Sequence, residues 1–458
     1  MVHKLLVIGA GFGGNGVITG LSEASQKYDE TEKNSAACLP WSCFQRKASG
    51  KSLFPGDLEI TMLDRKTNFS IGGTWQFVWS SRLIAPVIEW PFADLHASDF
   101  DNVQLLTGPD NATVEKLLPK EKRVILTNGK SLQYDTLVLS PGVISDPSEV
   151  PGLVPEKATA PTKQALDICN LKHVPLIQQG IDQVMLEAKK SPKTILVCVT
   201  RMPYKCPPVP FEVASILDDL RRERGVLDNV KIVLSVPVPF PFAGPPAAAL
   251  FKDLLKEQNI EFLNNHEVTK IVDGMTVHYR VVGGEENVTK VIKADLLLTT
   301  FPQRAPDFCK PLCDANGYIT VDLQTNKVKS ETDIYAIGDV CHAMFPKPGK
   351  PHPKAGEFAY LMGRHVADQI VASIKSPKGT SVPPPSRKAS CVAECGVAGK
   401  GVNIEPNFTD ILASPETGMP VFNFPVVDDA AGKKTDWVNG YLTKFFSPGK
   451  VAPFGTGS

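Results

Sequence analysis

A cysteine in a proline-rich turn is the first feature of the sequence that points to chemistry. Residues 193–212 begin as an apolar run and then place Cys206 directly after Lys205 and six residues before Glu212. Four prolines stiffen the turn, namely Pro203, Pro207, Pro208 and Pro210. Such a setting argues against an ordinary core cysteine. A lysine lowers the pKa of a neighbouring thiol if its side chain points the same way. Glu212 could either move protons or be a carboxylate favoured in the first turn of a helix.

The elements around this turn predict a parallel sheet that has lost a nucleotide site. The apolar, β-branched run at 194–199 is typical of a buried parallel strand, and a helix is predicted from about Phe211. A nucleotide-binding fold places a glycine-rich turn after such a strand, but this turn contains no glycine. The next predicted strand, at 230–236, ends in prolines, with no acid or arginine to bind a ribose. We therefore expect no tight binding of NAD(P)H here.

The start of the chain predicts a dinucleotide site of its own. An apolar strand at 4–8 leads into Gly9, Gly11 and Gly14, followed by a helix at about 15–21. In this setting the glycines let the backbone approach a pyrophosphate, which lies at the helix N-terminus. Asp64, at the end of the next predicted strand, is the expected ribose ligand. An inserted polar stretch, about residues 25–56, separates it from the glycines and is interpreted as a surface excursion.

A second cofactor signal lies in the later part of the chain. Gly338 and Asp339 end an apolar strand, where a glycine permits close approach and a carboxylate can accept a hydrogen bond from a ribityl hydroxyl. Lys354 follows at the start of a helix predicted to reach about Ile370. It could stabilise negative charge on a reduced flavin, or it could be a solvated first-turn lysine.

The composition excludes several classes of protein. The 458 residues contain 49 basic and 49 acidic side chains, so no basic surface for nucleic acid is expected. No apolar run approaches the roughly 20 residues of a membrane span, and a core strand begins too early to leave room for a signal peptide. We expect a cytoplasmic protein, with peripheral membrane contact left open.

The ten cysteines are dispersed through the chain. The three-residue gaps in Cys309/Cys313 and Cys391/Cys395 are unusual for zinc ligands, so no metal is expected.

The C-terminal region predicts one aromatic helix. Trp437, Tyr441, Phe445 and Phe446 fall at helical spacing on one face. Two interpretations remain open: the helix docks on the core, or it lies in the headgroup region of a membrane. A Pro/Ser-rich linker at 376–390 precedes this region.

Three separated segments, together with Ile337-Gly338-Asp339, give the chain a resemblance to a known family. They are 9–14, the Tyr-Lys-Cys-Pro-Pro-x-Pro-Phe-Glu segment at 204–212 and Cys-x-Ala-Glu at 391–394. The chain resembles sulfide:quinone oxidoreductases and the flavin subunit of flavocytochrome c sulfide dehydrogenase, over nearly its whole length apart from the insertion. The resemblance implies an α/β fold with two Rossmann-like dinucleotide-binding domains and a C-terminal extension. It also implies a flavoprotein oxidoreductase that binds FAD.

The resemblance also implies a reaction and its residues. Cys206 and Cys391 would form a disulfide that accepts sulfide, pass electrons through FAD to a quinone, and release sulfane sulfur. Some of these enzymes bind the flavin covalently through a cysteine in the loop after the second strand. Residues 67–71 contain no cysteine, which implies non-covalent FAD. Cys341, close to Gly338 and Asp339, remains an alternative partner for Cys206.

The expected domains are a FAD-binding domain in two parts, 1–160 and 295–375, a second Rossmann-like domain at 161–294, and a C-terminal domain at 376–458.

Two alternative functions remain. One is a type II NADH dehydrogenase-like quinone reductase, which needs the glycine turn and ribose ligand that are missing after residue 199. The other is a catalytically silent flavin-fold protein that serves as a binding module. Self-association into a homo-oligomer is left open.

Overall fold

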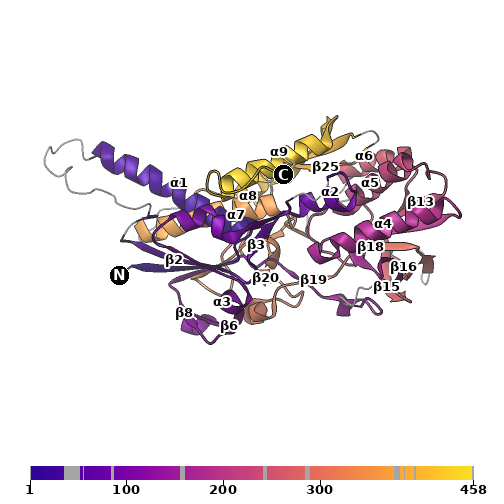
Figure 1. Ribbon diagram of the computed structural model, residues 1–458. Helices are drawn as coiled ribbons and strands as arrows, with labels where there is room; N and C mark the ends of the chain where they lie inside the picture. The colour runs from indigo at the N-terminus through magenta and orange to yellow at the C-terminus, as the bar shows by residue number, and fades with distance from the viewer. Residues whose placement is uncertain are drawn as a thin grey trace.

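The computed structural model describes residues 2–35, 52–54, 56–83, 87–154, 160–240, 245–283, 289–347, 349–375, 382–385, 387–396 and 399–455. Two five-stranded sheets form its two ends (Figure 1). The first has the order β21 (Ile334–Ala336), β9 (Thr136–Leu139), β1 (His3–Ile8), β2 (Leu58–Asp64) and β5 (Val103–Thr107). The second has the order β11 (Leu166–Asp167), β18 (Leu296–Thr300), β12 (Lys193–Val199), β13 (Val230–Ser235) and β14 (Glu261–Leu263).

Both sheets are parallel throughout. Residues 5–8 of β1 and 195–199 of β12 are buried along their whole length. Such continuous apolar runs are expected of parallel strands that are covered on both faces. The predicted strands at 4–8, 194–199 and 230–236 are confirmed to within one residue at each end.

Helices pack against both sheets and against one another. Helices α4 (Val174–Ala188), α5 (Val209–Glu223) and α6 (Pro245–Glu257) belong to the second sheet, whereas α1 (Phe12–Ser35) and α7 (Gly356–Lys375) pack against each other at the first. Three helices are short, namely α2 (Trp75–Trp79), α3 (Pro109–Ala112) and α8 (Thr409–Ala413). The last helix, α9 (Ala430–Phe445), lies above α7 in Figure 1.

The remaining strands form small sheets. The three- and four-stranded ones comprise β6 (Val114–Leu118), β7 (Arg123–Leu126) and β8 (Ser131–Gln133); β15 (His266–Val272), β16 (Thr276–Val281) and β17 (Thr289–Lys293); and β25 (Cys391–Ala393), β26 (Gly401–Asn407), β27 (Val421–Asn423) and β28 (Val426–Val427). The pairs are β3 (Asn68–Ser70) with β4 (Glu89–Pro91), β10 (Ile144–Ser145) with β19 (Gln303–Arg304), β20 (Ile319–Thr320) with β22 (Cys341–His342), and β23 (Met344–Phe345) with β24 (Lys350–Pro351).

The predicted surface excursion at 25–56 needs a correction at its start. Helix α1 continues to Ser35, well past the predicted end at residue 21, and Ser25 is buried. No proline or glycine interrupts residues 21–35, so nothing in this stretch ends the helix. The predicted excursion also contains Cys38, Trp41 and Cys43, to which the sequence assigns no role; these three lie outside the described residues.

The C-terminal aromatic helix docks on the core. Tyr441, Phe445 and Phe446 are each at most 3% exposed. The ring of Phe12, inside the glycine turn, lies 4.9 Å from Tyr441 and 5.4 Å from Phe445 between centroids. These aromatic side chains are therefore covered by protein, which decides between the two sequence interpretations in favour of docking.

Candidate active site

A cleft of about 430 Å³ lies at the carboxyl ends of the first sheet and contains most of the predicted cofactor ligands. Gly9, Gly11, Asp64, Gly338 and Asp339 all line it. Ligands of open α/β sheets bind at this edge, outside the carboxyl ends of the strands.

The glycine turn is shaped as a cradle. Gly9 has a φ of +108°, and a Cβ there would lie 2.0 Å from the carbonyl oxygen of Ser140. A Cβ on Gly11 would meet nothing within 4 Å, so the backbone is bare where it faces the cleft. Gly14 does not line the cleft. A Cβ on Gly14 would lie 2.0 Å from the Gly9 carbonyl oxygen, so this glycine permits close packing within the turn. The Asp64 carboxylate accepts a hydrogen bond from the Ala10 N–H at 2.9 Å, which fixes it at the rim.

These residues fit a dinucleotide. The turn offers bare backbone at the start of α1 for a pyrophosphate, and Asp64 lies where a ribose ligand is expected. The site therefore fits the FAD that the resemblance implies.

Lys354 is buried at 4% exposure, so the interpretation as a solvated lysine is wrong. Its Nζ donates to the carbonyl oxygens of Asp339 and Cys341, at 2.5 and 3.1 Å, and lies 4.0 Å from the centroid of the Tyr318 ring. Burial lowers the pKa of Lys354, opposed by Cys341 and Asp339. The Lys354 ammonium is thus held beside Gly338 and Asp339, the second cofactor signal of the sequence.

The turn that carries Cys206 is joined to the backbone of Lys354. The Cys206 N–H donates to the Lys354 carbonyl oxygen at 2.8 Å, and Lys205 pairs with Lys354 in an isolated β-bridge. Cys206 has a φ of +57°, a left-handed conformation that is uncommon for a residue with a side chain. Such strain is kept only where the surroundings impose it, and it is frequent at functional sites.

Cys391 lies close to Cys206 and both are free thiols. The two thiols are near enough for a charge on Cys206 to raise the pKa of Cys391, although burial is the larger cause. Burial also raises the pKa of Cys206 to about 12, with a further increase from the Glu212 carboxylate. The proximity supports the predicted pairing, and the disulfide itself stays a prediction.

A group of buried charges lies behind the two thiols. The Oε1 atom of Glu212 accepts hydrogen bonds from the Lys434 ammonium, from the Gln76 amide at 3.2 Å and from the Glu394 N–H at 2.7 Å. The Glu394 carboxylate lies 3.6 Å from the Lys434 Nζ and pairs with Arg82. Glu212, Glu394, Lys434 and Gln76 are each at most 6% exposed. Charges are stable at such depth only when they are paired in this way.

Several of these residues were missed from the sequence. Lys434, and not the neighbouring Lys205, is the cation among the main causes that lowers the pKa of Cys206. The Sγ of Cys169 lies 3.9 Å from the Lys205 carbonyl oxygen, and Cys169 also raises the pKa of Cys206. Lys434 lies 222 residues from Glu212, so no local pattern connects them.

Cys341 has different neighbours from Cys391. Its Sγ donates to the Gly338 carbonyl oxygen at 3.1 Å, and the nearest charges are Lys354, Arg387 and Asp339. Burial raises its pKa. Cys341 is thus held at Gly338, whereas Cys391 is the thiol whose pKa Cys206 raises.

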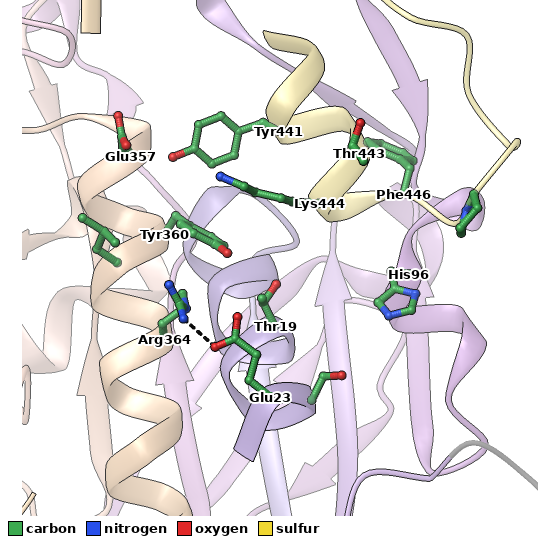
Figure 2. A pocket seen from close by; sticks show the side chains of 13 residues that line it. Thr19, Glu23, His96, Glu357, Tyr360, Arg364, Tyr441, Thr443, Lys444 and Phe446 are labelled. Carbon is green, nitrogen blue, oxygen red and sulfur yellow. Dashed lines mark hydrogen bonds and ion pairs between the residues drawn. The ribbon is translucent and has the colours of Figure 1, made fainter. Parts of the chain in front are cut away.

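A second pocket, of about 530 Å³, lies between α1, α7 and α9 (Figure 2). The rings of Tyr360 and Tyr441 flank the Lys444 ammonium, which lies 5.7 and 4.7 Å from their centroids. Arg364 forms an ion pair with Glu23 on the floor of the pocket. The pocket thus combines aromatic walls with a lysine that forms no ion pair among the described residues and opposes the rise that burial causes in the pKa of the nearby Glu357 carboxylate.

Glu357 links this pocket to the Cys391 segment. Its carboxylate accepts hydrogen bonds from the Ser390 N–H at 3.0 Å and from the Trp437 indole at 3.4 Å. Burial raises the pKa of Glu357.

No helix within the described ranges is long and apolar enough to cross a membrane. Nor do those ranges bring three metal-ligating side chains together.

Known proteins resemble the chain in sequence and in fold. Residues 208–363 match the family described as pyridine nucleotide-disulphide oxidoreductase. The mitochondrial sulfide:quinone oxidoreductase of Schizosaccharomyces pombe is 22% identical over 344 residues, which cover 74% of this chain and 68% of that protein. The crystal structure of the sulfide:quinone oxidoreductase from Aquifex aeolicus has a TM-score of 0.71 at 19% identity and covers 99% of this chain and 97% of its own.

A second solved structure, NDH2 from Plasmodium falciparum in complex with NADH, has a TM-score of 0.62 at 12% identity and covers 98% of this chain and 95% of its own. The predicted α/β fold is confirmed by these similarities. The chain is thus a flavoprotein oxidoreductase that is similar in sequence and fold to the sulfide:quinone oxidoreductases.

Proposed function

We propose that the protein oxidises sulfide to sulfane sulfur through Cys206 and Cys391 and passes the electrons by way of non-covalent FAD to a quinone. The main support is the hydrogen bond from the Cys206 N–H to the Lys354 carbonyl oxygen. This hydrogen bond joins the turn after β12 of the second sheet, which carries Cys206, to Lys354. The Lys354 ammonium in turn binds the carbonyl oxygen of Asp339, in the second cofactor signal.

The first step is a thiol–disulfide exchange. Hydrosulfide attacks one sulfur of the Cys206–Cys391 disulfide, forming a new S–S bond, and the bond between the two cysteines breaks with the electron pair on the departing thiolate. The attacked cysteine becomes a persulfide. A second hydrosulfide then takes the outer sulfur as hydrogen disulfide, which leaves two reduced cysteines.

The cysteines must then lose two electrons and two protons to become a disulfide again. Held in the cleft lined by Gly9, Asp64 and Gly338, FAD would supply the two-electron acceptor between the thiols and the quinone. Two hydrosulfides, one quinone and one proton thereby give one hydrogen disulfide ion and one quinol, which balances atoms and charge.

The protein's own groups suit this chemistry. A thiolate released at Cys206 is disfavoured by burial, and the nearby Lys434 ammonium offsets part of that cost. Glu212 is bound to Lys434, so we assign it an electrostatic role at the thiols in place of free proton exchange. Lys354 provides a buried cation bound to the carbonyl oxygen of Asp339, a residue that lines the cofactor cleft.

The second pocket is proposed as the quinone site. Tyr360 and Tyr441 offer faces for a planar ring, and Lys444 offers a donor for a quinone carbonyl. Because Glu357 and Tyr360 in the pocket share the start of α7 with Gly356 and Ala359 in the cleft, the two sites lie on neighbouring faces of one helix. Peripheral membrane contact, self-association and a cytoplasmic location stay predictions.

The alternative functions have less support. An NADH-dependent quinone reductase shares the fold, as the similarity to NDH2 shows. The turn after β12 nevertheless contains prolines and Cys206 where a nucleotide would need glycine. A silent binding protein would not need two neighbouring thiols, one of them joined to Lys354 by its backbone N–H.

The test is an anaerobic titration with sulfide, followed at the flavin absorption band, for wild type, Cys206→Ser and Cys391→Ser. We expect bleaching in the wild type, its loss in both variants, and recovery of the band when a soluble quinone is added. Cys313→Ser is the matched control, since Cys313 is also half-buried and its Sγ donates to the Cys309 carbonyl oxygen at 3.2 Å, as a serine could. Bleaching by NADH in place of sulfide would favour the NADH-linked alternative.

A further inference from the structure

Two residues far from both cysteine segments hold the residue that ends the Cys-x-Ala-Glu motif. Arg82, just after α2, pairs with the Oε2 atom of Glu394, and the Gln76 amide in α2 donates to its Oε1 atom. Arg82 also lies 3.5 Å from Asp219 of α5. Both oxygens of the Glu394 carboxylate are thus held by residues of one short segment.

Glu394 in turn anchors the strand of Cys391. Strand β25 is three residues long and is paired along one side, where Cys391 faces Ile404 of β26. At the other end of the segment, the Glu394 N–H donates to Glu212 of α5, the helix that follows the Cys206 turn. Glu394 therefore connects the strand of one cysteine to the helix of the other.

The inference builds on the relay proposed above. We propose that Arg82 and Gln76 are positioning residues of the redox site: by fixing the carboxylate of Glu394 they hold Cys391 where it can form a disulfide with Cys206. Neither residue needs to touch sulfide or the flavin for this role.

The physical reason is geometric and electrostatic. A disulfide forms without strain only within a narrow range of Cα separations and dihedral angles, so a small shift of a three-residue strand is enough to disfavour it. Burial opposes ionisation of Glu394, but Lys434 and Arg82 together hold its pKa below the usual range. Without Arg82, part of a buried negative charge loses its partner, and the segment gains by moving Glu394 toward water.

The experiment measures the disulfide equilibrium alone, without sulfide or quinone. The full-length protein is equilibrated anaerobically with glutathione buffers of known ratio, its thiols are trapped by alkylation, and the Cys206–Cys391 disulfide is quantified by peptide mass spectrometry. In this exchange the two thiols give two electrons and two protons to one glutathione disulfide, which becomes two glutathiones. The variants are Arg82→Met, Glu394→Gln, the double variant and Arg82→Lys.

Arg224→Met is the matched control. The Arg224 side chain is 28% exposed and pairs with Asp182 at 2.7 Å, against 24% exposure for Arg82. We expect Arg82→Met to lower the equilibrium constant for the disulfide about tenfold or more, since departures from disulfide geometry strain the bond and make it more reducible. Arg82→Lys should recover most of the loss, and Arg224→Met should match the wild type.

The double variant decides whether Arg82 acts through Glu394. If it does, Arg82→Met combined with Glu394→Gln is no worse than Glu394→Gln alone. Independent, additive losses, or an Arg82→Met equilibrium equal to that of Arg224→Met, would overturn the inference and leave the relay standing. Failure of the wild type to form a Cys206–Cys391 disulfide in oxidising buffer would instead remove the relay, and this inference with it. Unchanged far-ultraviolet circular dichroism verifies that each variant is folded.

Discussion

Cys206 owes its chemical setting to burial and to charged groups from separate parts of the chain. Glu212 and Cys169 raise its pKa, together with burial, and Lys434 lowers it. The net effect favours the protonated thiol at neutral pH, because the charged form of a buried cysteine is costly. A disulfide at this position carries no charge, so burial favours the oxidised state that the proposed reaction needs to begin.

This balance predicts the pH dependence of thiol labelling. For Cys206, with a pKa of about 12, the thiolate is a small fraction that grows about tenfold for each pH unit. The rate of alkylation by iodoacetamide in the reduced protein should therefore still be rising at pH 10. Removing the cation in Lys434→Met should slow the reaction further at each pH, whereas Lys433→Met, an exposed neighbour, should not. A plateau between pH 7 and 8 would contradict this account.

At the scale of elements, the cofactor cleft depends on how closely α1 approaches α7. A Cβ on Gly363 of α7 would lie 2.2 Å from the Gly13 carbonyl oxygen, inside the glycine turn. The two helices are therefore in backbone contact beside the expected pyrophosphate site. Only glycine allows this separation.

Gly363→Ala tests that contact. The methyl group has to displace α7 or the glycine turn, so we expect a loss of about 2 kcal/mol or more in the free energy of unfolding, the range for overpacking a core. We also expect less flavin to be retained per protein after gel filtration. Gly440→Ala in α9 is the control: its Cβ would meet nothing within 4 Å, and alanine favours a helix by about 1 kcal/mol over glycine. Equal stability of both variants in urea would show that the close approach is not needed.

The whole molecule places two cavities around the start of α7. Gly356 and Ala359 line the cofactor cleft, and Glu357 and Tyr360 line the second pocket. The C-terminal helix α9 closes the second pocket and also brings Lys434 to the cysteines. One helix thus joins the proposed sulfide end to the proposed quinone end.

This arrangement predicts that the two half-reactions can be separated. Lys444→Ala should raise the KM for a soluble quinone about tenfold, because a hydrogen bond from a charged donor is worth about 1.5 kcal/mol. Bleaching of the flavin by sulfide should be unchanged, since that half-reaction uses the cysteines. Lys433→Ala is the control on the same helix. If bleaching falls while the KM stays constant, the second pocket is not the acceptor site.

The sequence by itself determined the local features. The strands around Gly9 and Cys206, the Gly338-Asp339 pair at the end of an apolar strand, and the lack of a glycine turn after β12 all follow from local patterns. Hydrophobic periodicity and backbone freedom act over short stretches of chain. The resemblance added the pairing of Cys206 with Cys391, which no spacing reveals.

Only the tertiary structure decided which charges face the thiols. Lys434, Glu394, Gln76 and Arg82 come from three segments that are remote in sequence, and they meet because buried charges require partners. The same holds for the aromatic face of α9, whose pattern is equally suited to a membrane surface or to a protein core. An amphipathic helix specifies an apolar partner but not which one, and here packing against Phe12 made that choice.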